Sequence, residues 1–387
     1  MGKVRKMNFL IATDSFKDSL SSLDVGKCVE KGILGAMPDA QVVISPMADG
    51  GEGTIDALLH SGKGQEIEVQ VHSPLMDKIT TSYVVFSQED KEVVFIECAR
   101  SSGLPLVPTE LRNPMVTNTY GFGEQVKDAI NKGYRHFILS LGGSATNDGG
   151  IGMLQALGWE FFDEKGEHVG TEGNPLLQVA SFSDQNVLPE VVDCTFIVAS
   201  DVTNPFYGPN GAAHIFGRQK GASEEEIVIL NSSLQRFSAL IKENYDVDVQ
   251  EVAGAGAAGG LGGAIVGPLK GSIRSGVELV MELTGLEDKI KSADVVITGE
   301  GSLDNQSMMG KVPFGIAKLA RKYGKAVIGI AGRIDTNLEE VNKYFNGVFS
   351  IQTQCRTLEE ALNPKVTSLQ LEVTAQQIAK VIVGVQR

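Results

Sequence analysis

The sequence predicts a two-domain α/β protein built on mostly parallel sheets, and three observations support this fold class. The chain has 387 residues, more than one hydrophobic core usually holds. Short apolar strand segments alternate with helical segments towards both ends of the chain, an order typical of parallel strands with crossover helices. Between these regions, Ile67, Val69 and Val71 alternate with polar residues, which indicates an antiparallel or mixed sheet and marks a change of domain.

Glycine is the unusual feature of the composition. The 45 glycines among 387 residues amount to about 12%, against a usual content of ~7%. They lack a collagen-like period and gather where apolar strands end. We therefore expect several tight loops arranged around a ligand.

Charge and cysteine usage exclude some classes of partner. A formal net charge of −14 argues against nucleic acid and anionic membranes, because both select basic surfaces. An anionic substrate would therefore need local donors or a divalent cation. The four cysteines are scattered without metal-ligand spacing, and the first residues contain only a short apolar run, so we expect reduced thiols and a cytoplasmic location.

The N-terminal region reads as strand, turn, helix and strand. The segment 9–12 is a short buried strand that ends in the polar turn 13–22. Apolar residues at helical spacing follow over 25–36, and Ser21 with Asp24 resembles a capping box at the start of this helix. The second strand, 41–45, runs into the loop ADGGEGT at 48–54. Since ligands bind beyond the carboxyl ends of parallel strands, both loops are candidate binding elements.

The middle region contains a second glycine loop. Strands are expected over 80–86 and 93–97, a helical face over 122–130, and a buried strand over 137–141. The sequence GGSATNDGG at 142–150 follows this strand and leads into a helix. Its glycines allow close backbone approach, and a helix N-terminus favours anions, so the loop suits a phosphate. A tight turn made only for packing is the alternative.

A glycine-rich run further along the chain resembles a dinucleotide fingerprint. A buried strand at 195–200 leads into a loop at 200–213, and Ser223 with Glu226 forms a capping box for a long helix. Next, AGAGAAGGLGGA at 253–264 satisfies GxGxxG. We discount this match because the required βαβ unit does not surround it. Close backbone contact with a ligand or another helix is the preferred interpretation.

The last hundred residues return to strand–helix alternation. Strands are expected over 294–298, 326–330 and 347–351, with a helix from 313 to 323 and another capped by Thr357 and Glu360. The first strand opens into TGEGSLDNQSMMGK at 298–311. This third polar glycine loop is not a Walker A motif, because eight residues separate Gly301 from Gly310 where the P-loop requires four.

Six blocks together resemble the bacterial type I glycerate kinase family, in order and over nearly the whole chain. They are ATDSFKDSLSS (12–22), ADGGEGT (48–54), GGSATNDGG (142–150), SDVTNP (200–205), GAAGGLG (256–262) and TGEGSLDNQS with GKVP (298–313). The resemblance implies phosphorylation of D-glycerate by ATP with Mg²⁺, and we favour 2-phosphoglycerate over 3-phosphoglycerate as the product. We expect a monomer or homodimer. It also implies two α/β domains with the active site in the interdomain cleft. One domain would be discontinuous and made of residues 1–75 and 285–387. Residues 76–284 would form the second domain, inserted between these two segments.

Phosphoryl transfer needs charge neutralisation, positioning and often a carboxylate that accepts a proton. As proton acceptor we expect Asp201, which ends a buried strand, with Asp49 as electrostatic partner and Lys17 as a cation. The expected substrate-binding residues are Asp14, Ser15, Thr203 and Asn204. The expected phosphate- or nucleotide-binding residues are Gly50, Gly51, Gly142, Gly143, Ser144, Asn147, Gly299, Glu300, Gly301, Ser302 and Lys311. Asp148 and Asp304 are the expected metal ligands, and helix capping is the alternative role for both.

Two other functions use the same sequence features. A nucleotide-linked dehydrogenase of a small hydroxy acid would rest on the GxGxxG match and would bind NADH. A two-lobed small-anion binding protein would use the same loops without catalysis. Turnover of ATP in the presence of glycerate distinguishes the kinase from both.

Overall fold

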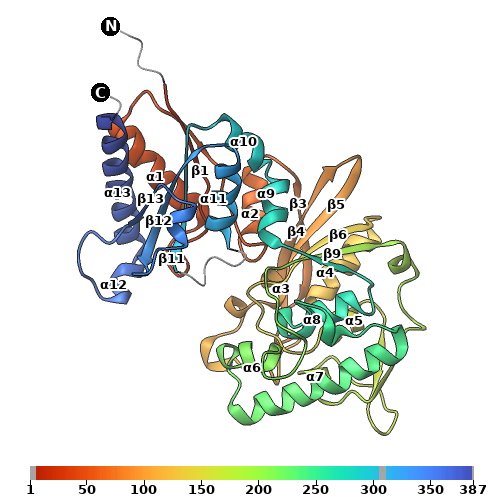
Figure 1. Cartoon of the computed structure of the whole chain (residues 1–387). Helices are drawn as coiled ribbons and strands as arrows, with labels where there is room; N and C mark the ends of the chain where they lie inside the picture. The colour runs from red at the N-terminus through yellow and green to blue at the C-terminus, as the bar shows by residue number, and fades with distance from the viewer. Residues whose placement is uncertain (1–5, 305–310, 386–387) are drawn as a thin grey trace. The chain divides into compact units, whose positions relative to one another are not determined.

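The computed structural model describes residues 6–304 and 311–385. These form two compact units (Figure 1). Unit 1 comprises Met1–Asp49, Asp56–Gly62 and Val277–Arg387, and unit 2 comprises Gly50–Ile55 and Lys63–Gly276. The predicted domain boundaries at residues 75 and 285 differ in place from the limits of these units.

Unit 1 is built on a five-stranded parallel sheet with the order β13-β12-β11-β1-β2. Its strands are β1 (Asn8–Ile11), β2 (Gln41–Ile44), β11 (Val295–Leu303), β12 (Ala326–Ile334) and β13 (Gly347–Ser350). Leu10 faces one hydrophobic cluster, whereas Phe9 and Ile11 face another. Because both faces of the sheet are covered, its strands read as continuous apolar runs in the sequence.

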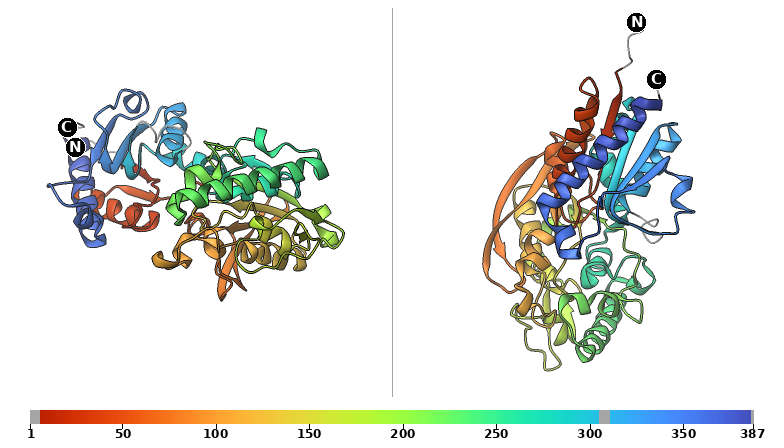
Figure 2. Two further views of the ribbon diagram at one scale, coloured as in Figure 1. Left: turned by 90° about the horizontal axis from the view of Figure 1, so that it is seen from below. Right: turned by 90° about the vertical axis from the view of Figure 1, so that its left-hand side faces the viewer.

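Helices cover both faces of this sheet. One face carries α1 (Ser22–Ala36) and α13 (Pro364–Val385), which lie side by side (Figure 2). A Cβ added to Gly32 of α1 would lie 2.3 Å from the carbonyl oxygen of Glu372, so glycine permits this close approach. The other face carries α10 (Leu286–Ser292), α11 (Val312–Lys322) and most of α9 (Gly276–Leu283). Among the described residues, unit 1 also includes the short helix α12 (Leu358–Leu362) and most of α2 (Thr54–His60).

Unit 2 is built on a six-stranded mixed sheet with the order β10-β9-β6-β5-β4-β3. Its strands are β3 (Gln65–His72), β4 (Lys78–Gln88), β5 (Lys91–Glu97), β6 (His136–Ser140), β9 (Thr195–Ala199) and β10 (Ser272–Arg274). β3, β4 and β5 pair antiparallel, and the remaining pairs are parallel. The antiparallel pattern expected around residues 67–97 is therefore present, and its first strand belongs to unit 2.

A large hydrophobic core packs against this second sheet. Its helices are α3 (Ala99–Ser102), α4 (Tyr120–Asn131), α5 (Ile151–Ala156), α6 (Ala212–Phe216), α7 (Glu224–Tyr245) and α8 (Leu261–Val266). The strands β7 (Glu160–Phe162) and β8 (Ser181–Ser183) pair as a separate two-stranded antiparallel sheet. The 3-10 helices of the described residues in unit 2 are η1 (Leu104–Leu106), η2 (Thr109–Leu111), η3 (Pro175–Leu177), η4 (Pro189–Asp193), η5 (Arg218–Lys220), η6 (Val249–Glu251) and η7 (Ala257–Gly260), whereas η9 (Val341–Lys343) lies in unit 1.

The predicted helix starts are largely confirmed. Ser223 with Glu226 and Thr357 with Glu360 form reciprocal capping boxes at α7 and α12. The hydroxyl of Ser21 accepts the backbone N–H of Asp24 at the start of α1. Over the residues that the structure covers, no helix combines the length and apolar character that crossing a membrane requires.

Candidate active site

The carboxyl edge of the unit 1 sheet contains a topological switch point. From β1 the chain continues to β2 on one side, whereas β11 leads to β12 and β13 on the other. Asp14 and Lys17 follow β1, and Gly299 and Glu300 lie in β11 beside it. The backbone N–H of Asp14 donates to the carbonyl oxygen of Gly299 at 2.9 Å. Ligands of open parallel sheets bind at such a point, so the structure brings predicted residues from two distant segments to a suitable place.

The carboxyl group of Asp14 has a strongly raised pKa. Burial raises its pKa to about 7, and the negative charges of Asp49 and Glu300 act in the same direction. The backbone N–H of Ser15, 2.6 Å from Oδ1, and the cation of Lys17 oppose the shift. A carboxyl group with a pKa near neutrality can accept a proton during turnover.

Several other predicted residues belong to unit 1. Asp49 follows β2 and is exposed, and Lys17 is exposed in the turn after β1. Lys311 Nζ lies 3.7 Å from Glu300 Oε1, with side chains 42% and 13% exposed respectively. Ser302 and Asp304 are partly buried. Residues 305–310 of the predicted third glycine loop lie outside the described residues.

In unit 2, the first and second glycine loops contact each other. A Cβ added to Gly142 would lie 2.8 Å from the Cα of Gly51. The backbone N–H of Ile55 donates to Glu97 Oε1 at 2.7 Å, which ties the segment 50–55 to the end of β5. Two loops that were predicted separately therefore form one glycine-lined surface at the carboxyl edge of the unit 2 sheet.

The 142–150 loop is held from beneath by a buried lysine that the sequence interpretation missed. Lys220 Nζ lies 2.8 Å from Ser144 Oγ and 2.7 Å from the carbonyl oxygen of Thr146. The lysine is 3% exposed, and burial lowers its pKa to about 8, although Cys98 and Asp148 favour the charged form. The surrounding sequence RQKG carries no apolar period that would have indicated a buried position.

Asp148, a predicted metal ligand, is hydrogen-bonded to its own loop and to Thr119. Its carboxylate accepts hydrogen bonds from the backbone N–H groups of Thr119, Gly150 and Gly152, and from the hydroxyl of Thr119. Burial raises its pKa, and these donors act against that shift. The residue has 0% exposure, so its oxygens serve the loop and the start of α5. Among the described residues, no group of three His, Cys, Asp or Glu side chains is placed to hold a metal ion.

Some buried polar atoms near this loop have no hydrogen-bond partner among the described residues. They are Ser102 Oγ, Ser140 Oγ, Thr146 Oγ1 and both amide atoms of Asn147. Buried polar groups are normally paired with protein or ordered water. This concentration of unpaired atoms indicates a site for water or a polar ligand.

Asp201 and its neighbours lie at the end of β9. Ser275 Oγ donates to Asp201 Oδ1 at 2.7 Å, so the carboxylate is oriented by the segment after β10. Asn204 Nδ2 donates to the carbonyl oxygen of Asn210 at 2.9 Å, and Thr203 is exposed. Of these predicted substrate-binding side chains, Thr203 is the one presented to solvent.

The glycine run 253–264 is a packing element. It follows the 3-10 helix η6 and leads through η7 into α8. A Cβ at Gly256 would lie 2.2 Å from the carbonyl oxygen of Pro205, and one at Gly259 would lie 2.2 Å from that of Thr146. The run therefore supports the loops after β6 and β9 by backbone contact. This agrees with the interpretation of the run as a close-contact segment rather than a dinucleotide-binding motif.

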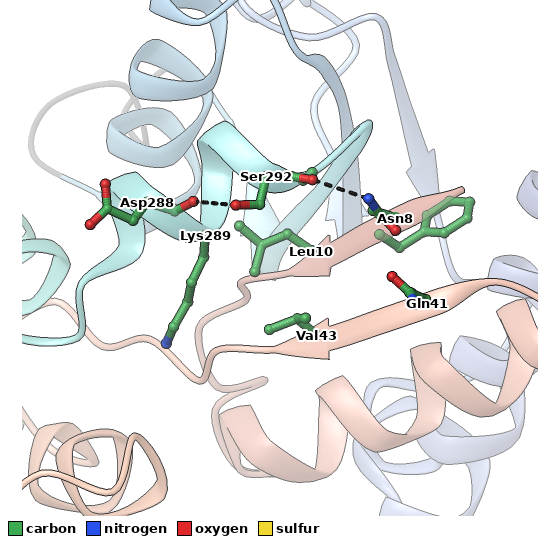
Figure 3. Close-up of a pocket in the computed structure, with 9 residues that line it drawn as sticks. Asn8, Leu10, Gln41, Val43, Asp288, Lys289 and Ser292 are labelled. Carbon is green, nitrogen blue, oxygen red and sulfur yellow. Dashed lines mark hydrogen bonds between the residues drawn. The ribbon is translucent and has the colours of Figure 1, made fainter. Parts of the chain in front are cut away.

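Two of the cavities among the described residues of unit 1 differ in their lining. One of about 380 Å³ lies along β1 and β2 beside α10, and its lining includes Asn8, Gln41 and Lys289 (Figure 3). Asn8 and Gln41 begin their strands, whereas Lys289 Nζ donates to Ser45 Oγ at 3.0 Å, just beyond the carboxyl end of β2. The other, of about 640 Å³, includes Lys17 and Gly301 in its lining.

Comparisons with known proteins agree with these observations. Residues 9–383 match the model of the glycerate kinase family. A glycerate 2-kinase of Escherichia coli (strain K12) is 45% identical over 356 residues, which cover 92% of this chain and 93% of the relative. A glycerate kinase of Bacillus cereus is 42% identical over 376 residues, covering 97% and 98%.

A solved structure provides the same comparison in three dimensions. It is a crystal structure assigned to a glycerate kinase 2 of Salmonella typhimurium LT2, with a TM-score of 0.82 and 40% sequence identity. The similarity covers 99% of this chain and 100% of that one. The predicted architecture of two α/β domains with mostly parallel sheets is thereby confirmed.

Proposed function

Since this chain belongs to the glycerate kinase family, we propose that it phosphorylates the 2-hydroxyl of D-glycerate with ATP and Mg²⁺. Activity as an ATP-dependent kinase acting on glycerate follows from the family, because relatives of 38% to 45% identity carry that name. The choice of the 2-hydroxyl is supported by the name of the Escherichia coli relative. Neither a dehydrogenase nor a non-catalytic anion-binding protein agrees with this family.

Asp14 is the proposed proton acceptor. The hydroxyl oxygen of glycerate attacks the γ-phosphorus, the bond from this phosphorus to the oxygen bridging it to the β-phosphorus breaks, and the hydroxyl proton passes to the carboxylate. A raised pKa of about 7 lets Asp14 hold this proton near neutral pH and release it afterwards. Asp201, which the sequence favoured for this role, is instead proposed to orient the substrate together with Thr203.

Cations of unit 1 are proposed to neutralise substrate charge. Lys17 lies in the turn after Asp14, and Lys311 pairs with Glu300 at 3.7 Å. Both side chains come from the carboxyl edge of the sheet, so they suit the carboxylate of glycerate or a transferred phosphoryl group. Ser15 and Asp49 remain proposed neighbours of the substrate.

The glycine-lined surface of unit 2 is proposed to bind an anionic group through its backbone. Gly50, Gly51, Gly142 and Gly143 lack side chains that would block approach. Asn147 supplies a buried amide with no partner among the described residues. The ammonium group of Lys220, which contacts Ser144, places a positive charge next to the loop. This charge would attract a phosphate or carboxylate.

Mg²⁺ is proposed to arrive with the nucleotide. When bound, it neutralises charge on the phosphates that are transferred and released. Mg²⁺ needs only one or two protein carboxylates, with phosphates and water as the other ligands, so the lack of a preformed three-ligand group among the described residues is compatible with it. Asp304 remains a proposed ligand, whereas Asp148 is committed to the 142–150 loop.

We further propose a cytoplasmic monomer or homodimer without nucleic acid or membrane partners. The cysteines Cys28, Cys98, Cys194 and Cys355 are all unpaired, as expected in a reducing compartment. The net charge of −14 disfavours polyanionic partners. Sedimentation of the purified protein would determine the oligomeric state.

Phosphorus NMR of the product made from ATP, Mg²⁺ and D-glycerate tests the proposed function. We expect the resonance of 2-phosphoglycerate, with loss of product when a chelator removes the metal. A product identified as 3-phosphoglycerate would overturn the proposed site of phosphorylation. Undiminished turnover in excess chelator would overturn the proposed requirement for Mg²⁺.

A further inference from the structure

The larger cavity of unit 1 lies at the carboxyl ends of three neighbouring strands. Its volume is about 640 Å³, within the range of ~300–1,000 Å³ that small-molecule sites occupy. Gly301 comes from β11, Arg333 from β12, and Ile351 directly follows β13. The turn after β1 contributes Lys17. The cavity therefore occupies the position where a parallel sheet binds its ligands.

The charge of this cavity is opposite to that of the protein. Its lining contains three cations, Lys17, Arg333 and Arg356, and none of the described residues that line it is Asp or Glu. The chain as a whole carries a formal charge of −14. Such a local excess of positive charge favours an anionic ligand.

The two guanidinium groups are available for binding. Within the described parts of the chain, neither guanidinium group forms an ion pair or a hydrogen bond. The Nη1 atom of Arg356 is shielded from solvent and has no hydrogen-bond partner there. A buried donor without a partner is unfavourable until a ligand or water supplies an acceptor.

We propose that Arg333 and Arg356 in this cavity bind the phosphate chain of the nucleoside triphosphate. The assignment rests on the proposed kinase function and adds two residues that no glycine motif includes. Guanidinium groups bind phosphate oxygens in a planar, often bidentate arrangement. Hydroxyl and amide side chains of the lining, such as Thr353 and Gln352, supply further polar contacts for the nucleotide.

The size of the cavity favours a nucleotide over a smaller anion. The phosphate group of phosphoglycerate shares the same chemistry and is the other possible source of the anion. A site of about 640 Å³ exceeds what one phosphate and three carbons fill. We therefore assign the cavity to the nucleotide, and make phosphoglycerate an arm of the test.

The test is equilibrium binding by titration calorimetry to the full-length protein and its variants Arg333→Gln and Arg356→Gln. Loss of a charge-assisted hydrogen bond corresponds to about 10- to 100-fold in affinity, so we expect Kd for ATP to rise by that factor. The effect should be smaller for AMP and absent for adenosine, because the arginines contact phosphate. Arg356→Lys should recover part of the loss, since it keeps the charge.

Controls separate a specific site from general charge. Lys318→Gln removes an exposed cation of the same unit and should leave Kd for ATP unchanged. Thermal unfolding of each variant checks that the fold is retained. Unchanged ATP affinity in both arginine variants of an active kinase would overturn the inference and leave the proposed function standing, as would weakened binding of phosphoglycerate alone. An inactive wild-type protein that still shows the arginine-dependent ATP binding would instead contradict the proposed function.

Discussion

Asp14 and Asp148 both follow buried parallel strands in glycine- or serine-rich loops, yet their surroundings differ. Asp148 is fully buried and accepts hydrogen bonds from Thr119, Gly150 and Gly152. Asp14 accepts one hydrogen bond in the described part of the chain, from Ser15, and faces other carboxylates. Burial raises the pKa of both.

The number of donors, rather than burial, distinguishes a structural carboxylate from a reactive one. Donors around Asp148 stabilise its charged form and occupy its oxygens, so the side chain fixes a loop. Negative neighbours around Asp14 have the opposite effect and leave the carboxyl group ready to exchange a proton. We propose that Asp14 takes part in proton transfer, whereas Asp148 stabilises the 142–150 loop.

Asp14→Asn should give the largest effect of the variants considered. Loss of a positioned base typically costs about 10²–10⁴ in rate, so kcat should fall by that factor while the unfolding free energy is retained. Steady-state kinetics with D-glycerate and ATP measure this effect. Asp39→Asn, which changes an exposed carboxylate of the same unit, is the matched control. Near-normal kcat in Asp14→Asn would remove Asp14 from the chemistry.

Asp148→Asn should act on stability first. The new amide would place N–H donors against donors of Thr119 and Gly152, and we expect a loss of about 3 kcal/mol in unfolding free energy. Urea unfolding measures the loss, with Asp77→Asn, at an exposed position of unit 2, as control. A fully stable Asp148→Asn protein with a weakened metal requirement would restore the predicted role of metal ligand.

Lys220→Met should change the pH dependence of stability. The folded-state pKa of about 8 lies below the ordinary value of 10.5, so between these values the unfolded chain binds a proton that the folded chain lacks. The stability of the wild type relative to Lys220→Met should therefore rise from pH 8 to pH 10.5, by about 1–3 kcal/mol. Urea unfolding at pH 7.5 and pH 10 measures the unfolding free energies of both proteins. If the free-energy difference between wild type and Lys220→Met is the same at both pH values, the lowered pKa of Lys220 is contradicted.

Asp201→Asn should give the smallest effect on kcat. Ser275 orients this carboxylate, so its loss should raise KM for glycerate about tenfold while kcat changes by less than that factor, as expected for an interaction present equally in the ground and transition states. Initial rates over a range of glycerate concentrations separate the two constants. A fall of kcat by 10²–10⁴ in Asp201→Asn would instead support the assignment made from the sequence.

The sequence predicts the helices and strands of this protein better than the tertiary contacts between them. Apolar runs and capping boxes identify strands such as β6 and helices such as α7, because these signals are local. Contact between Gly51 and Gly142 depends on the folded arrangement of segments far apart in the chain. Neither loop carries a signal for the other, so each was predicted as a separate phosphate site.

Several site residues lie beyond sequence reasoning for a similar reason. Lys220 occurs in a polar stretch that reads as solvent-exposed, and only the packing around Ser144 and Thr146 buries it. Arg333 and Arg356 belong to no motif, and they line one cavity because β12 pairs with β13 in the folded sheet. Asp148 and Asp14 look alike in sequence, because the donors around Asp148 include Thr119 from another segment.

The pH dependence of kcat/KM for the wild type and Asp14→Asn determines whether Asp14 accepts the proton, because this profile reports ionisations of the free enzyme. We predict that wild-type kcat/KM falls below a pKa of about 7 as Asp14 becomes protonated. The remaining activity of Asp14→Asn should lack this limb. A wild-type profile that stays flat down to the ordinary range of carboxyl groups, or a limb near pH 7 that persists in Asp14→Asn, would contradict the assignment.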